Sequence, residues 1–332
     1  MLFFIASCSR MAILTPAEKV PVAASKNERL LLDQGEQYFK QGKFQAALQK
    51  VQQAYQLNPG SAEALYAIAL CYLSLEEYAS SLEYSRRAAA YRSEVLPDTY
   101  LLMGTAYQRL DDPWNALRSY RFAAGQYPDN AKLQYRLGET YVYLGKPEFA
   151  ADAFKAAIAA APDDAASHYQ LGMLYFANRY DIPALLSLSA ALLLEPDDAM
   201  APSVRQNLVD LLDSDLENRN TDEGDFQAVA ASLLRQRTAL LNRGEKPAGF
   251  ETVKALYLTL YAQLDTANIR NQKMSPVMHR YVTFYSRLHQ QGLDETSVYY
   301  IFQNSEDKFI SDWLEKYAQK VKQLEQLVKD SW

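Results

Sequence analysis

Residues 131–164 read AKLQYRLGETYVYLGKPEFAADAFKAAIAAAPDD, and residues 165–198 read AASHYQLGMLYFANRYDIPALLSLSAALLLEPDD. The second block repeats the pattern of the first at an offset of 34 residues. The matched positions are Leu137-Gly138 with Leu171-Gly172, Tyr141 with Tyr175, Ala150 with Ala184, Phe154 with Leu188, Ala157 with Ala191, and Pro162 with Pro196. A fixed period of this length is typical of repeat proteins, in which each unit buries its apolar face by stacking on its neighbours.

The same pattern continues toward the N-terminus, so that five units fit the chain. Their bounds are 28–61, 62–95, 97–130, 131–164 and 165–198. Gly or Ala at the eighth position, as at Gly138 and Gly172, leaves room where two helices cross closely. Aromatic residues or Leu at the eleventh and twenty-fourth positions fill the space between helices. Pro at the thirty-second position cannot continue a helix and ends the unit.

This pattern closely resembles the tetratricopeptide repeat, a helix-turn-helix unit of 34 residues. The resemblance implies an all-α fold, in which five such repeats form a right-handed superhelix. In this family the first helix of each repeat lines the concave surface. That register places there Tyr66, Gln108, Arg109, Lys132, Tyr135, Arg136, Glu139, Tyr143, Tyr169, Gln170 and Phe176.

Aromatic rings beside polar groups are typical of binding surfaces, so we expect this concave surface to bind a protein or peptide partner. Tyr135, Arg136 and Tyr169 form the centre of the predicted cluster. Packing of the same rings against neighbouring helices explains them equally well, and both interpretations stay open.

The carboxylate clamp that some family members use to bind heat-shock chaperones is incomplete here. Lys132 and Arg136 match its last two positions. Leu102, Tyr66 and Leu70 stand where that clamp has Asn, Lys and Asn. Binding of the chaperone motif is therefore not predicted.

The second half of the chain departs from the repeat pattern but keeps helical signals. Residues 199–225 are expected to form a capping helix, opened by Pro202, and an acidic linker. Residues 226–332 are expected to form a C-terminal helical domain with its own core. Its predicted helices span about 226–243, 250–268, 275–291, 294–303 and 306–329. The last of these carries an apolar stripe of helical period.

The first residues resemble the start of a bacterial lipoprotein. Ile5-Ala6-Ser7-Cys8 is similar to a lipobox, and the resemblance gives Cys8 the role of the lipid-modified residue. Residues 1–8 would be a lipoprotein-type signal segment and 9–27 a flexible tether, which implies a lipid-anchored protein of the bacterial cell envelope. No Lys or Arg precedes the short apolar run. The alternative is a cytoplasmic adaptor whose translation starts at Met11.

Composition and motifs favour a binding protein over an enzyme. The formal net charge of −6 makes a general affinity for nucleic acid unexpected. The three histidines, His168, His279 and His289, lack metal-site spacing, and His168 occupies a packing position of its repeat. We expect no catalytic residue, no metal site and no cofactor. The alternative is an enzyme whose site lies in residues 226–332, which a pocket rich in carboxylates or His would indicate.

Overall fold

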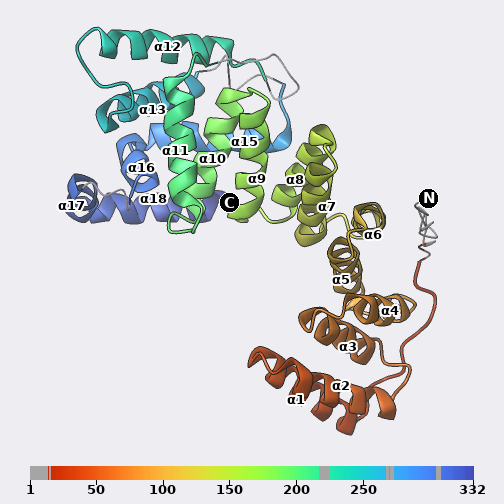
Figure 1. The fold of residues 1–332 in the computed structure, drawn as a ribbon. Helices are drawn as coiled ribbons and strands as arrows, with labels where there is room; N and C mark the ends of the chain where they lie inside the picture. The colour runs from red at the N-terminus through yellow and green to blue at the C-terminus, as the bar shows by residue number, and fades with distance from the viewer. Residues whose placement is uncertain (1–13, 15, 217–223, 267–268, 270–272, 304–307) are drawn as a thin grey trace, which may run out of the picture. The chain divides into compact units, whose positions relative to one another are not determined.

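The computed structural model describes residues 14, 16–216, 224–266, 269, 273–303 and 308–332. These residues form helices joined by short turns, and Lys19 pairs with Tyr91 in an isolated parallel bridge. Figure 1 shows the helices in chain order. The all-α prediction is confirmed. Within the described ranges, no helix combines the length and hydrophobicity that a membrane crossing requires. The chain divides into two compact units, residues 1–153 and 154–332, called unit 1 and unit 2 below.

Unit 1 is a stack of helix-turn-helix pairs that correspond to the first four predicted repeats, whereas the fifth repeat lies in unit 2. Neighbouring first helices contact one another along the stack, α1 with α3, α3 with α5, and α5 with α7. The division between the units falls within α8, Pro147–Ala160. The other helices of unit 1 are α1 Lys26–Lys40, α2 Phe44–Leu57, α3 Ala62–Ser74, α4 Tyr78–Ala88, α5 Leu96–Arg109, α6 Pro113–Gln126 and α7 Ala131–Tyr143.

The turn inside each repeat has the same backbone geometry. One residue of each turn has a positive φ, at Gly42, Glu76, Asp111, Gly145 and Arg179, with values from 56° to 72°. These residues recur at the repeat period of 34 or 35. A left-handed residue is a common way to end a helix, and glycine adopts it without steric cost. The turn geometry therefore repeats although the residue type does not.

The small residue at the eighth repeat position is explained by close helix crossing. A Cβ atom added at Gly104 would lie 2.3 Å from the ring of Tyr120, which is fully buried. One added at Gly172 would lie 2.7 Å from a methyl carbon of Leu188. In both cases the neighbour is the residue at the twenty-fourth position of the same repeat. The prediction that Gly172 marks a close contact is confirmed.

The segment before α1 requires a correction, because residues 16–24 are bound to unit 1 and are not a free tether. We call these residues the N-terminal strap. The backbone N–H of Lys19 donates to the carbonyl of Ala90 at 3.0 Å, and Arg92 donates to the carbonyl of Lys19 at 2.8 Å. Asn58 donates its side-chain amide to the carbonyl of Val22 at 3.2 Å. In Figure 1 the strap is the extended trace that leads into α1. These backbone bonds depend on tertiary structure, so apolar periodicity could not predict them.

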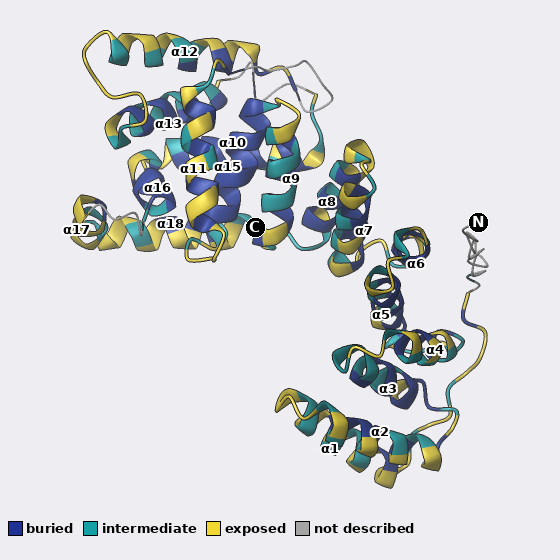
Figure 2. Ribbon diagram, in the orientation of Figure 1, coloured by how far each residue is buried: buried dark blue, intermediate teal, exposed yellow. Residues whose placement is uncertain are grey.

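Unit 2 is built around α10, Asp181–Leu194, in which every residue from Asp181 to Leu193 is buried. Figure 2 shows this helix dark blue along its length. A helix that is apolar on all sides must be surrounded by protein. Its partners are α9, α11, α15 and α16. The helices of unit 2 besides α10 and the end of α8 are α9 Ala165–Ala177, α11 Ala201–Asp213, α12 Gln227–Leu241, α13 Phe250–Leu264, α15 Pro276–Gln290, α16 Asp294–Ile301, α17 Lys308–Lys316 and α18 Ala318–Ser331.

The fifth repeat therefore shares one core with the C-terminal helices, whereas the sequence predicted a separate core for 226–332. Hydrogen bonds of buried side chains join the two parts. Tyr257 and Ser189 share a hydrogen bond of 2.8 Å between their hydroxyl groups, and Tyr285 donates to the carbonyl of Leu186 at 2.9 Å. Arg205 of α11 donates to the carbonyl of Ile301 at 2.7 Å. The bounds of the predicted domains thus do not separate two cores.

The single helix predicted over 306–329 is two helices, α17 and α18, which meet at Tyr317. The ring of Trp313 in α17 stacks flat on Tyr299, with ring centroids 4.0 Å apart. Leu324, Leu327 and Val328 of α18 are buried instead, and α18 contacts α15 and α16. Both α17 and α18 contact α16, and the helix breaks between them at Tyr317.

Candidate functional site

The predicted binding residues of unit 1 lie on first helices that are fixed to one another. Gln108 of α5 donates its side-chain amide to the hydroxyl of Thr140 in α7 at 3.1 Å. The hydroxyl of Tyr120 donates to Oε1, the side-chain amide oxygen of Gln108, at 3.2 Å. Gln108 is thus half-buried in a hydrogen-bond network between repeats three and four. Gln108 therefore holds α5 against α7, and its side-chain amide already makes hydrogen bonds within the protein.

Arg136, Tyr135 and Glu139 form a connected group on α7. Arg136 makes an ion pair with Glu139 at 2.7 Å and lies over the ring of Tyr135, 5.9 Å from its centroid. Such contacts between exposed groups add little stability, but they hold the guanidinium in one place. The group presents a fixed cation beside a half-buried ring.

The other predicted residues of unit 1 differ in exposure. Tyr143 at the end of α7 is 69% exposed, and Arg109 and Lys132 are also exposed. Tyr66 of α3 is half-buried, and burial together with the charge of Asp98 raises the pKa of its hydroxyl. Tyr143, Arg109 and Lys132 are therefore open to a partner, whereas Tyr66 is partly used in packing.

Three predicted residues lie on α9 in unit 2, namely Tyr169, Gln170 and Phe176, and each is half-buried. Burial, followed by the charge of Asp198, raises the pKa of Tyr169. A single cluster that joins these residues with Tyr135 and Arg136 stays a prediction.

The two cysteines were given different roles by the sequence. Cys8 lies outside the described residues, so its lipidation stays a prediction. Cys71 is buried in the apolar core of the second repeat, where burial raises the pKa of its thiol to about 11. A protonated, inaccessible thiol is unreactive, as expected for a packing residue.

His168 is also a core residue, as the repeat register predicted. It is fully buried, and its Nδ1 and Nε2 atoms lie 2.7 Å from the hydroxyl of Tyr281 and 2.8 Å from the carbonyl of Pro162. Trp332 contacts its ring edge-on, with centroids 4.9 Å apart. Elsewhere in the described ranges, no group of three or more His, Cys, Asp or Glu side chains could hold a metal ion.

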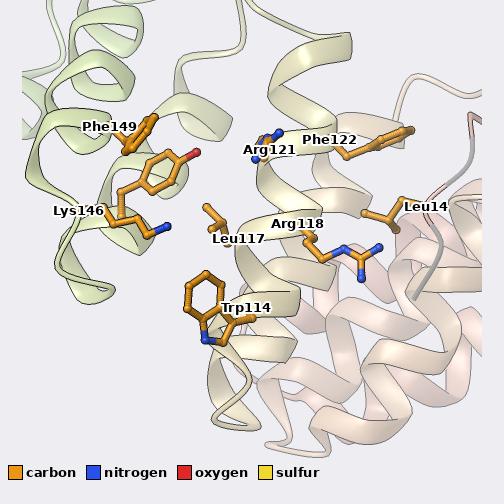
Figure 3. Close-up of a pocket in the computed structure, with 9 residues that line it drawn as sticks. Leu14, Trp114, Leu117, Arg118, Arg121, Phe122, Lys146 and Phe149 are labelled. Carbon is orange, nitrogen blue, oxygen red and sulfur yellow. The ribbon is translucent and has the colours of Figure 1, made fainter. Parts of the chain in front are cut away.

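Sequence reasoning missed a cavity on the second-helix side of unit 1. The cavity has a volume of about 620 Å³ and lies between α6 and the start of α8, so we call it the α6–α8 pocket. Figure 3 shows its lining side chains. They are Leu14, Trp114, Leu117, Arg118, Arg121, Phe122, Tyr141, Lys146 and Phe149.

A sequence signal for this pocket was present. Trp114, Arg118 and Arg121 stand at positions i, i+4 and i+7, which places them on one side of α6. The family resemblance points to first helices as the binding surface, whereas α6 is a second helix. The contribution of Leu14 to the pocket wall could not be predicted, because it depends on where the chain runs before the first repeat.

Comparisons with known proteins agree with this architecture. Residues 32–94 and 135–179 match the family model described as Tetratricopeptide repeat. The BBSome complex member BBS4 homolog of Drosophila melanogaster is 32% identical over 93 residues, which are 27% of this chain and 19% of that protein. This chain thus spans about a fifth of the length of that relative.

Solved structures similar to this chain include the thermophilic TPR protein TTC0263 of Thermus thermophilus. It has 26% identity and a TM-score of 0.44 over 56% of this chain and 98% of its own. Another is YrrB, a TPR protein with an unusual peptide-binding site, with 21% identity and a TM-score of 0.43 over 53% of this chain and 90% of its own. The family match and the helix-turn-helix pairs together show that this chain contains tetratricopeptide repeats over residues 32–94 and 135–179.

Proposed function

We propose that this protein is a non-catalytic interaction scaffold that binds a protein partner on the first-helix surface of its repeats. One observation carries the proposal: α5 and α7 are fixed side by side and present exposed Arg109, Lys132, Arg136 and Tyr143. Packing within the unit does not account for a 69% exposed tyrosine on a helix that also carries exposed Lys132 and Arg136. Tyrosine and arginine are the residue types that most often dominate binding energy at protein interfaces.

The chemistry of this surface favours an extended or helical segment that carries carboxylates. Arg136 is already held by Glu139, so a partner carboxylate can replace or share that contact without ordering a free side chain. The ring of Tyr143 offers a large apolar contact at a low cost in conformational entropy.

Truncation of this surface should weaken partner binding and leave folding intact. A photo-crosslinking residue placed at Tyr143 in cells should capture the partner, which can then be purified. Tyr143→Ala and Arg136→Ala should each reduce its affinity by about 1–2 kcal/mol, or roughly 5- to 30-fold. Isothermal titration calorimetry with the full chain measures both.

Arg235→Ala is the matched control, since Arg235 is an exposed arginine of unit 2. Its affinity for the captured partner should equal that of the parent. Thermal melts of Tyr143→Ala should match the parent, because the ring is exposed. Undiminished affinity in both test variants would exclude this surface as the binding site.

The alternative function, an enzyme with a site in residues 226–332, has less support. The centre of unit 2 is made of tyrosines, with Tyr257, Tyr261, Tyr281, Tyr285 and Tyr299 all fully buried. Burial raises the pKa of Tyr257, Tyr261 and Tyr285. Protonated phenols that hydrogen-bond to neighbouring helices are typical of packing rather than of acid–base catalysis.

We further propose that the protein is lipid-anchored through Cys8 in a bacterial cell envelope. The lipobox-like run Ile5-Ala6-Ser7-Cys8 supports this. The cytoplasmic adaptor that begins at Met11 is the alternative.

Lipidation of Cys8 should place the native protein in the detergent phase of a Triton X-114 extract, and Cys8→Ser should move it to the aqueous phase. Cys71→Ser is the control that keeps the anchor. Mass spectrometry of the N-terminus tests independently whether Cys8 carries a lipid. An unmodified terminus at Met1 or Met11 would rule out the anchor.

A further inference from the structure

We propose that the α6–α8 pocket is a second docking site, separate from the first-helix surface. It binds a segment of a partner protein in which a large apolar side chain is flanked by acidic residues. Tyr141 of α7 is in the pocket wall, but the pocket shares no lining residue with the predicted first-helix surface, so the scaffold can hold two segments at once.

The charge of the pocket is the first argument. Arg118, Arg121 and Lys146 line it, and no carboxylate is among the lining residues in the described part of the chain. Three cations around one cavity favour an anionic occupant. Figure 3 shows Lys146 on one side of the cavity and the two arginines of α6 on the other.

Arg118 supplies the second argument. Its Nη1 atom is shielded from solvent and has no hydrogen-bond partner within the described part of the chain. A buried donor without a partner is destabilising, and a charged donor is more so. A partner carboxylate is an acceptor that would satisfy it, and arginine binds carboxylates in a fixed, forked geometry.

The apolar walls require a large side chain between the charges. Leu117, Phe122 and Tyr141 form the inner surface, and the ring of Phe149 stacks on Tyr141 with centroids 5.4 Å apart. Trp114 and Phe149 are each 57% exposed. Exposed rings gathered at one cavity are unusual unless something covers them. Lys146 lies 5.2 Å from the Trp114 ring centroid, which fixes the indole at the rim.

An adjoining cavity indicates that the occupant is an extended segment rather than a compact molecule. This second cavity, of about 350 Å³, shares Phe122 with the first and is lined by Arg92, Ser93 and residues of the strap. It adds a fourth cation, and the hydroxyl of Ser93 is buried without a partner in the described part of the chain. A surface that continues from Trp114 to Arg92 accommodates several residues of chain.

Binding of designed peptides to the full chain tests the proposal. The probe is a fluorescein-labelled peptide of one phenylalanine with two aspartates on each side, measured by fluorescence anisotropy. Two further peptides replace the aspartates by asparagine or the phenylalanine by alanine. The acidic phenylalanine peptide should bind at least tenfold more tightly than either.

Arg118→Gln with Arg121→Gln should weaken binding of the acidic peptide at least tenfold, and Arg235→Gln should not change it. If the double variant does not fold, as judged by circular dichroism, Lys146→Gln should still weaken binding at least threefold. Equal binding of the asparagine peptide, or equal binding by the folded variants, would overturn the proposal.

Other occupants give different results, and each would overturn it. A membrane site would appear as arginine-dependent binding to vesicles that contain phosphatidylglycerol, without peptide binding. A contact between two copies of this chain would appear as self-association in analytical ultracentrifugation that Trp114→Ala abolishes. Peptide affinity that rises tenfold or more on deletion of residues 1–13, with no charge preference, would assign the pocket to the chain's own N-terminus.

Discussion

Tyr261→Ala is expected to lower the free energy of unfolding of unit 2 by about 3–5 kcal/mol, the range typical of large aromatic truncations in cores. Tyr261 is fully buried, and its ring stacks on Tyr285 with centroids 5.3 Å apart and planes 8° apart. Its hydroxyl accepts a hydrogen bond from Ser297 at 3.2 Å. Truncation therefore leaves a cavity where α13, α15 and α16 meet.

Urea denaturation followed by tryptophan fluorescence measures this loss, because Trp313 and Trp332 both belong to unit 2. Tyr261→Phe keeps the ring and should cost only about 0.5–1.5 kcal/mol, the value of one hydrogen bond. Tyr143→Ala removes an exposed tyrosine and should change stability by less than about 0.5 kcal/mol. A loss below about 1 kcal/mol for Tyr261→Ala would show that unit 2 does not form this core.

Acidification is expected to destabilise unit 2 through His168. Burial lowers the pKa of this histidine from 6.5 to about 4, even though the carbonyl of Pro162 and the charges of Asp163 and Asp164 act in the opposite direction. Arg280 lowers the pKa further. Since Pro162 offers only an acceptor, Nε2 carries the proton and Nδ1 accepts from Tyr281.

The sign of the effect follows from which state binds the proton. Above pH 6.5 His168 is neutral both in the folded and in the unfolded chain, so it contributes no pH dependence. Between pH 6.5 and about 4 only the unfolded chain takes up the proton. Stability should then fall by roughly 1.4 kcal/mol per pH unit, about 3 kcal/mol in all, and this contribution should level off below about pH 4.

His168→Gln provides the control for the acid effect, because glutamine does not titrate and can keep one donor and one acceptor. Carboxylates titrate equally in parent and variant, so the difference between their stability–pH profiles isolates His168. Parallel profiles from about pH 7 to about pH 4.5 would contradict a buried, neutral histidine.

The sequence predicted the repeat helices well because their signal is local and periodic. Gly172 lies at a close helix crossing, as the 34-residue spacing of small residues predicts. Gly145 forms the turn at the position where the pattern ends the first helix of the fourth repeat. Each of these features depends on residues within one or two repeats. The repeat period is therefore enough to predict these helix crossings and turns.

Features that depend on distant contacts were missed. α10 is buried on all sides, and α15 and α16 are among the helices that cover it. The spacing of Leu185 and Leu192 does not indicate which helices these are. The break at Tyr317 follows Trp313, which stacks on Tyr299 of α16, a contact that lies outside the helical period. Of the predicted binding residues, Tyr143 is exposed as a contact residue should be, whereas Gln108 is committed to a network that only the structure reveals.

The N-terminal strap changes the order in which the repeats of unit 1 should unfold. In a simple repeat array each unit contacts only its neighbours, so the array frays from its ends one repeat at a time. Here Val22 is bound by Asn58 at the end of repeat one, and Lys19 is bound by Ala90 and Arg92 at the end of repeat two. Opening the first repeat must also release contacts that the strap makes with the end of the second. The first two repeats should therefore exchange their amide protons as one cooperative block rather than as a gradient from the terminus.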